Sequence, residues 1–448
     1  MARLRLVCRR PMPFLNKDSF LDSTTFTALG LAEPLLRALN DLSYAEPTPI
    51  QARSIPLLLE GRDMLGIAQT GTGKTAAFAL PLLHHLITEP ARPQPKTTRA
   101  LILAPTRELA VQIGEQIRAY GRHVGLRHAV IFGGVPHKNQ NRSLSRGVDI
   151  VVATPGRLLD HMEHGSLRLD EVSHLVLDEA DRMLDMGFQR DVQKILKALP
   201  MRRQSLLFSA TMPASVAELA ARILKNPERV EVTPKAITVD LIDQSVHYVD
   251  AGRKQSLLGE ILADESLNRV IVFTRTKHRA DRLALQLEKH GISTDSLHGN
   301  KSQNARQRAL QRFRNGDARI LVATDIAARG IDVPNVSHVI NFELPNEPEN
   351  YVHRIGRTAR AGARGIAISL CEPSEESYLR AIEKLLKQPV AVASGEPSKV
   401  FTPPPGRGKN NRGGGRPGGN KPYGNGARPN RSSNNGGRNN RRPDRAAA

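Results

Sequence analysis

The chain has 448 residues, more than one ordinary domain holds, which predicts two folded domains with additional segments. Its hydrophobic content of 39% can fill their cores, and its net charge of +21 indicates a polyanionic partner, nucleic acid before a membrane surface. The two cysteines lie far apart in the sequence, which argues against a disulfide framework or a zinc site and favours a reducing compartment. No apolar run reaches the ~18 residues of a transmembrane helix, so we expect a cytoplasmic protein without a membrane partner.

The two ends of the chain differ in composition from its middle. Residues 1–25 carry four arginines among the first ten positions, and we expect them to form a disordered N-terminal extension, with an organellar presequence as the alternative. Residues 391–448 are predicted to be a disordered basic tail, because Gly, Asn, Arg and Pro dominate from Thr402 onward. From Thr402 the tail holds eleven Lys or Arg and one Asp, so it supplies +10 of the net charge.

Between these ends, short apolar runs alternate with amphipathic helices, a pattern typical of parallel sheets covered by helices. We expect a first α/β domain at 26–230, a linker at 231–243 that contains Pro234, and a second α/β domain at 244–390. In the first domain, strands are expected at 64–67, 100–103, 129–132, 150–153, 175–177 and 205–208, and helices at 31–42, 76–87, 108–120, 156–161, 191–199 and 216–224. In the second, strands are expected at 270–273, 320–322, 336–340 and 366–370, and helices at 256–262, 279–290, 305–313 and 378–386.

A phosphate loop is predicted between the first expected strand and the helix at 76–87. It consists of Ala68, Gln69, Thr70, Gly71, Thr72, Gly73, Lys74 and Thr75. Glycine lets backbone N–H groups converge on phosphate oxygens, and the start of the helix adds its positive dipole end. Lys74 would reach the β- and γ-phosphates, and the Thr75 hydroxyl would bind Mg²⁺. The alternative is a glycine-rich turn without a ligand, and Ala68 stands where the general pattern has its first glycine.

Three carboxylates follow the buried strand expected at 175–177. Asp178 stands at the strand end, where it would be the second Mg²⁺ anchor opposite the phosphate loop. Glu179 is placed to orient or deprotonate an attacking water. The alternative is a solvated helix cap.

The sequence Asp178-Glu179-Ala180-Asp181 resembles the name-giving motif of the DEAD-box RNA helicases. The resemblance covers residues 26–386, where further family motifs occur in the family's order, including the phosphate loop that opens with Ala68. These motifs stand at 43–51, 105–110, 133–134, 154–157, 209–211, 272–275, 303–306, 324–332 and 353–360. The stretch at 182–188 resembles the bacterial RhlE-type group within the family. The family resemblance implies two RecA-like domains that use ATP and Mg²⁺ and act on RNA.

The resemblance also assigns residues to the nucleotide site. The aromatic ring of Phe26 would stack on adenine, and the amide of Gln51, with both a donor and an acceptor, would read the base edge. Arg357 and Arg360 would act as arginine fingers from the second domain, and Gly330 and Asp332 would contact the nucleotide there. Coupling of hydrolysis to RNA is assigned to Asp181, Ser209, Thr211 and His353.

A second group of residues is assigned by the resemblance to RNA. These residues are Arg107, Gly134, Thr154, Arg157, Arg275, Gln303, Arg306, Thr324 and Arg329. They supply cations, side-chain donors and backbone N–H groups, which suit phosphates and sugars and predict little sequence specificity. Contacts to the 2′-OH would distinguish RNA from DNA.

The sequence departs from the family's motif sequences at two places. Ser43-Tyr44 stands where Gly-Phe is common, and Ala359 stands where Gly is usual. Neither change removes a charged or catalytic group, although Ala359 could alter the loop that aims Arg360.

The predicted function is an RNA-stimulated ATPase that locally unwinds short RNA duplexes or remodels RNA–protein complexes. Two alternatives remain at this point: a non-enzymatic RNA-binding or annealing clamp, and a DNA translocase on the same fold. Intact Lys74, Glu179 and Arg357 argue against the clamp. Ribosomal or RNA-decay proteins are the candidate protein partners.

Overall fold

The structure is a computed structural model of the whole chain. It describes residues 25–69, 71–232, 241–328, 333, 336–359 and 364–398. The N-terminal extension up to residue 24, the centre of the expected linker and the basic tail from residue 399 lie outside the described residues. The same holds for Thr70, Arg329, Gly330, Asp332 and Arg360 among the predicted site residues.

The first folded region is built on a seven-stranded sheet in which every pairing is parallel. The strand order is β3-β4-β2-β5-β6-β1-β7. The strands are β1 (Met64–Ala68), β2 (Thr98–Leu103), β3 (His128–Ile131), β4 (Val148–Ala153), β5 (His174–Leu177), β6 (Gln204–Ser209) and β7 (Glu228–Val232). Because the central strands are buried on both faces, their sequences are continuous apolar runs, and most of these strands could therefore be predicted from the sequence.

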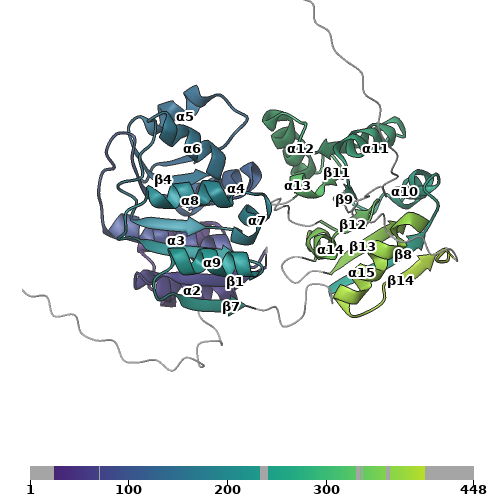
Figure 1. Cartoon of the computed structure of the whole chain (residues 1–448), viewed down its shortest axis with the longest axis horizontal. Coiled ribbons are helices and arrows are strands. Elements are labelled where there is room, and N and C mark those ends of the chain that lie inside the picture. Colours follow the sequence, from purple (N-terminus) through teal and green to yellow (C-terminus); the bar gives the residue numbers. More distant parts are fainter. Residues whose placement is uncertain are drawn as a thin grey trace, which may run out of the picture. The chain divides into compact units, whose positions relative to one another are not determined.

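Helices cover both faces of this sheet (Figure 1). Along β2, Ile102 packs into one core and Leu103 into the other, because successive side chains of a strand point to opposite faces. On the Ile102 face lie α1 (Glu33–Asp41), α2 (Pro49–Leu59), α3 (Lys74–Thr88), α4 (Arg107–Tyr120) and the short 3-10 helix η1 (Phe26–Leu29). On the Leu103 face lie α5 (His137–Leu144), α6 (Pro155–Glu163), α7 (Ala180–Asp185), α8 (Gln189–Lys197) and α9 (Ala214–Ile223).

The second folded region repeats this architecture with the strand order β10-β11-β9-β12-β13-β8-β14, again parallel throughout. Its strands are β8 (Ile242–Tyr248), β9 (Val270–Thr274), β10 (Thr294–Leu297), β11 (Ile320–Thr324), β12 (His338–Asn341), β13 (Gly365–Cys371) and β14 (Ala391–Ser394). One face is covered by α10 (Lys254–Leu262) and α11 (Lys277–Lys289). The other carries α12 (Gln303–Asn315), α13 (Asp325–Ala328), α14 (Pro348–Ile355) and α15 (Glu376–Leu386), while η4 (Pro373–Glu375) precedes α15.

Helix starts in both regions are fixed by hydroxyl caps that the sequence carries. Thr106 Oγ1 accepts a hydrogen bond from the backbone N–H of Leu109 at 3.2 Å, and α4 begins directly after Thr106, at Arg107. Ser302 caps α12 in the same way, by accepting from the N–H of Ala305 at 3.3 Å. Each cap satisfies an N–H that the helix leaves without a partner, a contribution of about 1 kcal/mol.

The expected fold class is confirmed, and several boundaries change. The tail does not begin at residue 391, because residues 391–394 form β14, which pairs with β8 and is the edge strand of this sheet. Likewise, β7 extends to Val232 and β8 begins at Ile242, so the expected linker was too long at both ends. The expected helix at 31–42 is α1, which begins at Glu33 and carries Pro34 in its first turn, where proline is tolerated. Within the part of the chain that the structure describes, no helix is long and apolar enough to cross a membrane.

The close approach of β1 to β6 predicts a stability effect at Gly66. A Cβ at Gly66 would lie 2.6 Å from the ring of Phe208, so Gly66→Ala should overpack the core and lower the free energy of unfolding by about 1–3 kcal/mol. Gly259→Ala in α10 is the matched control, because a Cβ there meets nothing within 4 Å and a helical Gly→Ala change stabilises. Urea unfolding measures both, and equal effects would contradict the packing described here.

Candidate functional site

The neighbouring strands β5, β6 and β1 bring three predicted motifs to one edge of the first sheet. The phosphate loop follows β1, Asp178 follows β5, and Ser209 ends β6. Since β6 pairs with both β5 and β1 in parallel, the carboxyl ends of all three strands meet. In open α/β sheets this edge is where ligands bind.

The phosphate loop is closed by its own lysine. Lys74 is 6% exposed, and its Nζ donates to the carbonyl of Ala68 at 2.8 Å, while the Thr72 hydroxyl donates to the carbonyl of Gln69 at 2.8 Å. Gly71 and Gly73 have φ values of +85° and +92°, a left-handed backbone that favours glycine. The loop therefore curls around the end of the Lys74 side chain.

Gln51 connects the start of α2 to this loop. Its Nε2 donates to the carbonyl of Gly73 at 3.1 Å, and its Oε1 accepts from the backbone N–H of Thr48 at 2.9 Å. The side chain is only 2% exposed, and a Cβ at Gly73 would collide with it. Gln51 thus touches the phosphate loop, whereas its contact with adenine stays a prediction, as does stacking by Phe26, whose ring is buried beside Tyr44.

The two acidic residues after β5 have different electrostatic environments. Burial raises the pKa of Asp178 to about 6, and the charge of Lys74 opposes this shift. Burial would also raise the pKa of Glu179, but the Arg182 guanidinium, Lys74 and Arg357 outweigh it and hold that pKa below its usual range. At neutral pH both groups are therefore carboxylates, and the ionised state of Asp178 depends on nearby positive charge.

The Arg182 guanidinium hydrogen-bonds and pairs with Glu179 in the buried site. Glu179 itself has φ +51°, a left-handed conformation that costs a non-glycine residue about 1–2 kcal/mol. Sequence reasoning did not assign a role to Arg182. Its spacing of three residues from Glu179 was the available signal, since residues three apart share a helical face.

Asp181 holds the residues that follow β6. Its Oδ2 accepts from the backbone N–H of Thr211 at 2.9 Å, from the Thr211 hydroxyl at 2.9 Å and from the N–H of Ala210 at 3.2 Å. The hydroxyl of Ser209 donates to the carbonyl of Thr211 at 2.7 Å, and the N–H of Asp181 donates to this hydroxyl at 3.3 Å. The predicted coupling residues of the first region thus form one hydrogen-bonded unit.

In the second region, Arg354 is a buried structural cation that sequence reasoning left without a role. It is 1% exposed and forms a bidentate pair with Asp325 at 2.5 and 2.8 Å, while its Nη1 donates to Asn341 Oδ1 at 3.1 Å. The predicted finger Arg357 is 5% exposed, and its Nε donates to the carbonyl of His353 at 3.0 Å. Arg354 therefore anchors the end of α14, and Arg357 follows two residues after this helix.

Four predicted RNA-binding residues lie together in segments that follow the strands β2, β3 and β4. Gly134 has φ +80°, and a Cβ there would collide with the Arg107 guanidinium. Arg157 Nη1 donates to the carbonyl of Val135 at 3.0 Å, and Thr154 is the residue before α6. Burial, together with the charges of Arg306 and Arg157, lowers the pKa of Arg107, so cations are concentrated here.

The other predicted RNA-binding residues come from the second region. Arg275 lies 3.2 Å from the buried Glu375 Oε1, and its backbone N–H donates to Glu343 Oε2 at 2.8 Å. Gln303 Nε2 donates to Glu108 Oε1 at 3.1 Å, and Arg306 Nε lies 3.0 Å from the same oxygen. Thr324 ends β11 and is 8% exposed.

Comparison with known proteins assigns this arrangement to a family. A model described as DEAD/DEAH box helicase matches residues 48–219, and one described as helicase conserved C-terminal domain matches residues 253–362. ATP-dependent RNA helicase CshA of Listeria monocytogenes is 45% identical over 367 residues, which cover 82% of this chain and 69% of that protein. The chain belongs to the DEAD-box RNA helicase family. CshA of Bacillus subtilis is likewise 45% identical, over 81% of this chain and 73% of that protein.

Solved structures of DEAD-box helicases share the fold. Dbp5 of S. cerevisiae bound to RNA and ADP BeF3 is 34% identical with a TM-score of 0.74, and the match covers 83% of this chain and 96% of that one. Mss116p bound to ssRNA and AMP-PNP is 31% identical with a TM-score of 0.74, and the match covers 86% of this chain and 82% of that one. The two sheets are therefore RecA-like, and this DEAD-box helicase is an enzyme that uses a nucleotide and acts on RNA. The expected RhlE-type subgroup finds no support, because these curated relatives are named CshA.

Both departures from the DEAD-box motif sequences lie where the backbone is left-handed. Ser43 has φ +58° and Ala359 has φ +54°. Glycine is usual at these positions because it alone adopts this conformation without a steric cost. Tyr44, the other change, adds a hydroxyl that lies 3.2 Å from the hydroxyl of Tyr120.

Restoring glycine should stabilise this DEAD-box helicase. Ala359→Gly and Ser43→Gly should each raise the free energy of unfolding by up to about 1 kcal/mol, because relief of the left-handed strain exceeds the added entropy of the unfolded chain. Ala221→Gly, on the exposed face of α9, is the control and should lose about 1 kcal/mol. If all three variants lost stability in urea unfolding, the backbone assignment at residues 43 and 359 would be wrong.

Proposed function

We propose that this DEAD-box helicase couples ATP hydrolysis to the local separation of short RNA duplexes or to the remodelling of RNA–protein complexes. The observation that carries the proposal is the hydrogen-bonded unit of Asp181, Ser209 and Thr211, beside both Glu179 and the phosphate loop. A displacement of the residues after β6 would be felt at the carboxylate cluster through these bonds. Coupling of RNA binding to hydrolysis needs such a physical connection between the residues after β6 and the carboxylate cluster.

The nucleotide site fits ATP with Mg²⁺. No cluster of three or more His, Cys, Asp or Glu side chains that could hold a metal occurs among the described residues, so a metal here would need phosphate oxygens as additional ligands. Asp178, 2% exposed with a raised pKa, is a carboxylate that a nearby cation would stabilise, and Thr75 is the proposed second ligand. When bound, Mg²⁺ would neutralise developing charge on the phosphates.

Glu179 is the proposed acceptor of the proton from the attacking water. Its pairing with Arg182 keeps it ionised and fixes the orientation of its carboxylate inside the site. Lys74, already at the mouth of the phosphate loop, would exchange its bond to the Ala68 carbonyl for phosphate oxygens. Gln69, Thr70, Gly71, Thr72 and Gly73 would supply backbone donors.

The second RecA-like region is proposed to complete the site. Arg357 and Arg360 would stabilise transition-state charge, with Gly330 and Asp332 on the nucleotide and His353 in the coupling path; of these, Arg360, Gly330 and Asp332 lie outside the described residues. Support for Arg357 comes from the pKa of Glu179, because the Arg357 charge is one of the smaller contributions that lower this pKa, after those of Arg182 and Lys74.

RNA is proposed to bind through its backbone. The guanidinium of Arg107 above the turn that contains Gly134 provides a cationic surface for phosphates, with Thr154 and Arg157 beside it. Arg275, Gln303, Arg306 and Thr324 would extend the contact from the second region. Such contacts carry no base readout, so discrimination of RNA from DNA would depend on the 2′-OH.

Three finer assignments rest on the sequence alone. A cytoplasmic location is proposed from the cysteine usage, which fits a reducing compartment. The RhlE-type subgroup rests only on the wording at 182–188, against relatives named CshA. Ribosomal or RNA-decay partners would have to be identified by binding experiments.

Glu179→Gln tests the chemistry. It should retain ATP and RNA binding and lower RNA-stimulated turnover by about 10²–10⁴-fold, because an amide cannot accept the proton. Lys74→Ala should lose turnover through weaker phosphate binding. Glu163→Gln, an exposed residue at the end of α6, is the control and should behave as the parent does. Hydrolysis by Glu179→Gln at the parent rate in a single-turnover assay would refute the role of this carboxylate.

Deletion of residues 402–448 tests the tail, which lies outside the described residues. Its eleven Lys or Arg against one Asp would hold RNA beside the folded regions by charge. The deletion should leave turnover at saturating RNA unchanged, raise the RNA concentration for half-maximal ATPase activity and flatten its salt dependence. An unchanged half-saturation and salt slope would show that the tail does not bind RNA.

A further inference from the structure

The turn formed by Gly133 and Gly134 is held at both ends by side-chain hydrogen bonds. On one side, Gln140 Nε2 donates to the carbonyl of Phe132 at 3.0 Å. On the other, Arg157 Nη1 donates to the carbonyl of Val135 at 3.0 Å and to Gln140 Oε1 at 3.2 Å. Gln140 is therefore the side chain that joins the two ends of the turn.

The orientation of the Gln140 amide follows from its partners. A carbonyl can only accept, so the NH₂ group must face Phe132, and Oε1 must face Arg157. His161 Nε2 lies 2.9 Å from the same Oε1 and must therefore be its protonated nitrogen. His161 is 0% exposed, and burial and the nearby His137 and Arg157 lower its pKa to about 4, so the ring is neutral at physiological pH.

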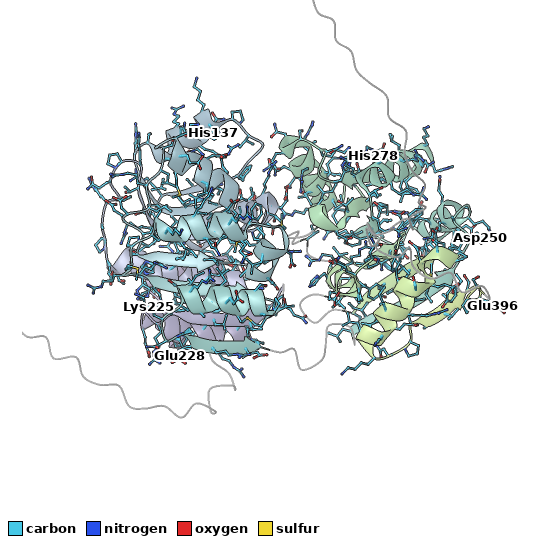
Figure 2. The ribbon with its side chains drawn as sticks, viewed as in Figure 1. His137, Lys225, Glu228, Asp250, His278 and Glu396 are labelled. Atoms are coloured by element: carbon cyan, nitrogen blue, oxygen red, sulfur yellow. The ribbon has the colours of Figure 1, made fainter. Side chains whose placement is uncertain are left out.

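The network is built from buried side chains at one edge of the first sheet. Gln140, on α5, is 8% exposed, and His161 lies on α6. Figure 2 labels His137, at the start of α5, far from Glu228, which opens β7 at the opposite edge of this sheet. Four strands, β4, β2, β5 and β6, separate β3 from β1 and the phosphate loop, so Gln140 has no contact with the nucleotide site.

The Gly133-Gly134 turn lies directly under Arg107. A Cβ at Gly134 would collide with the guanidinium, and one at Gly133 would lie 3.3 Å from Arg107 Nη2. The turn therefore lies against both cations, since it packs next to the Arg107 guanidinium and accepts a hydrogen bond from Arg157 at Val135. Two cations with a fixed separation can bind a phosphate backbone with less loss of side-chain entropy than two mobile ones.

We propose that Gln140 is a positioning residue for RNA binding, which fixes the Gly133-Gly134 turn and the Arg157 guanidinium and is itself oriented by His161. The proposal rests on the proposed function, because Gln140 would hold in place the residues of the first RecA-like region that are proposed to bind RNA. Gln140 would touch neither RNA nor ATP. Its loss should act on RNA affinity and leave the chemical step intact.

Gln140→Leu is the principal test, since leucine has a similar size and cannot form any of the three hydrogen bonds. We expect the RNA concentration for half-maximal ATPase activity to rise about tenfold, with turnover at saturating RNA within twofold of the parent. The slope of log affinity against log salt should fall by up to about one, because the Arg157–phosphate contact would be lost. Asn141→Leu, an exposed neighbour on the same helix, is the matched control and should change neither value.

A double-mutant cycle separates positioning from general damage. In an Arg157→Ala background, Gln140→Leu should raise the half-saturating RNA concentration by less than about threefold, because its main partner is already gone. Gln140→Glu provides the second variant if Gln140→Leu fails to fold. It retains an acceptor for Arg157 and His161 and loses the donor to Phe132, so its affinity loss should be smaller than that of Gln140→Leu.

Several outcomes would overturn the proposal. These are an unchanged half-saturating RNA concentration in Gln140→Leu, a loss of turnover at saturating RNA without a loss of affinity, or equal effects of Gln140→Leu in the parent and Arg157→Ala backgrounds. If Gln140→Leu fails to fold, an unchanged affinity in Gln140→Glu overturns it. A parent protein without RNA-stimulated ATPase activity would instead refute the proposed function, so the two failures are distinguishable.

Discussion

Parallel pairing of β5 and β1 with β6 between them is the constraint on which the nucleotide site depends. Lys74 is more than a hundred residues of sequence away from Asp178 and Ser209, and the pairing brings the strand ends that carry these residues together. Asp181 then adds a second constraint, because its carboxylate accepts three hydrogen bonds from the residues after β6. A chain that loses this pairing would keep the individual motifs and lose their connection.

Buried charge at the site is supported by specific partners. Glu179 and Arg182 neutralise each other inside the first RecA-like region, and Arg354 and Asp325 do so in the second. Such pairs add little net stability but cost several kcal/mol when one partner is removed. The first pair includes Glu179, and the second lies close in sequence to Arg357, so each buried pair helps to position a residue with a proposed role in catalysis.

The motifs and most central strands were predictable from the sequence because their signals are local. The phosphate loop has its glycines and its lysine within eight residues, and β2 and β4 are continuous apolar runs. By contrast, α5 has a polar sequence with only Gln140 and Leu144 buried, so periodicity gave no signal for it. β14 is exposed at all four residues and exists because β8 offers an edge. Arg354 pairs with Asp325, 29 residues away, a contact that only the tertiary fold creates.

The proposed RNA-binding surface also combines signals that are local in the sequence with contacts that only the tertiary fold creates. The resemblance to the family pointed to Arg107, Gly134 and Arg157 individually. Their mutual arrangement depends on Gln140 and His161, which no motif singled out. Serine and alanine do not themselves indicate the left-handed backbone at residues 43 and 359, and the glycine that is usual at both positions in the family was the available signal.

The measurement that tests the central claim most directly compares ATP hydrolysis by the full chain with RNA and with single-stranded DNA of the same sequence. A DEAD-box helicase that binds its nucleic acid through backbone and 2′-OH contacts should be stimulated by RNA of any sequence and show little stimulation by DNA. Equal stimulation by RNA and DNA would indicate a DNA translocase on this fold. Hydrolysis unchanged by RNA would contradict the connection between the RNA-binding surface and the carboxylate cluster.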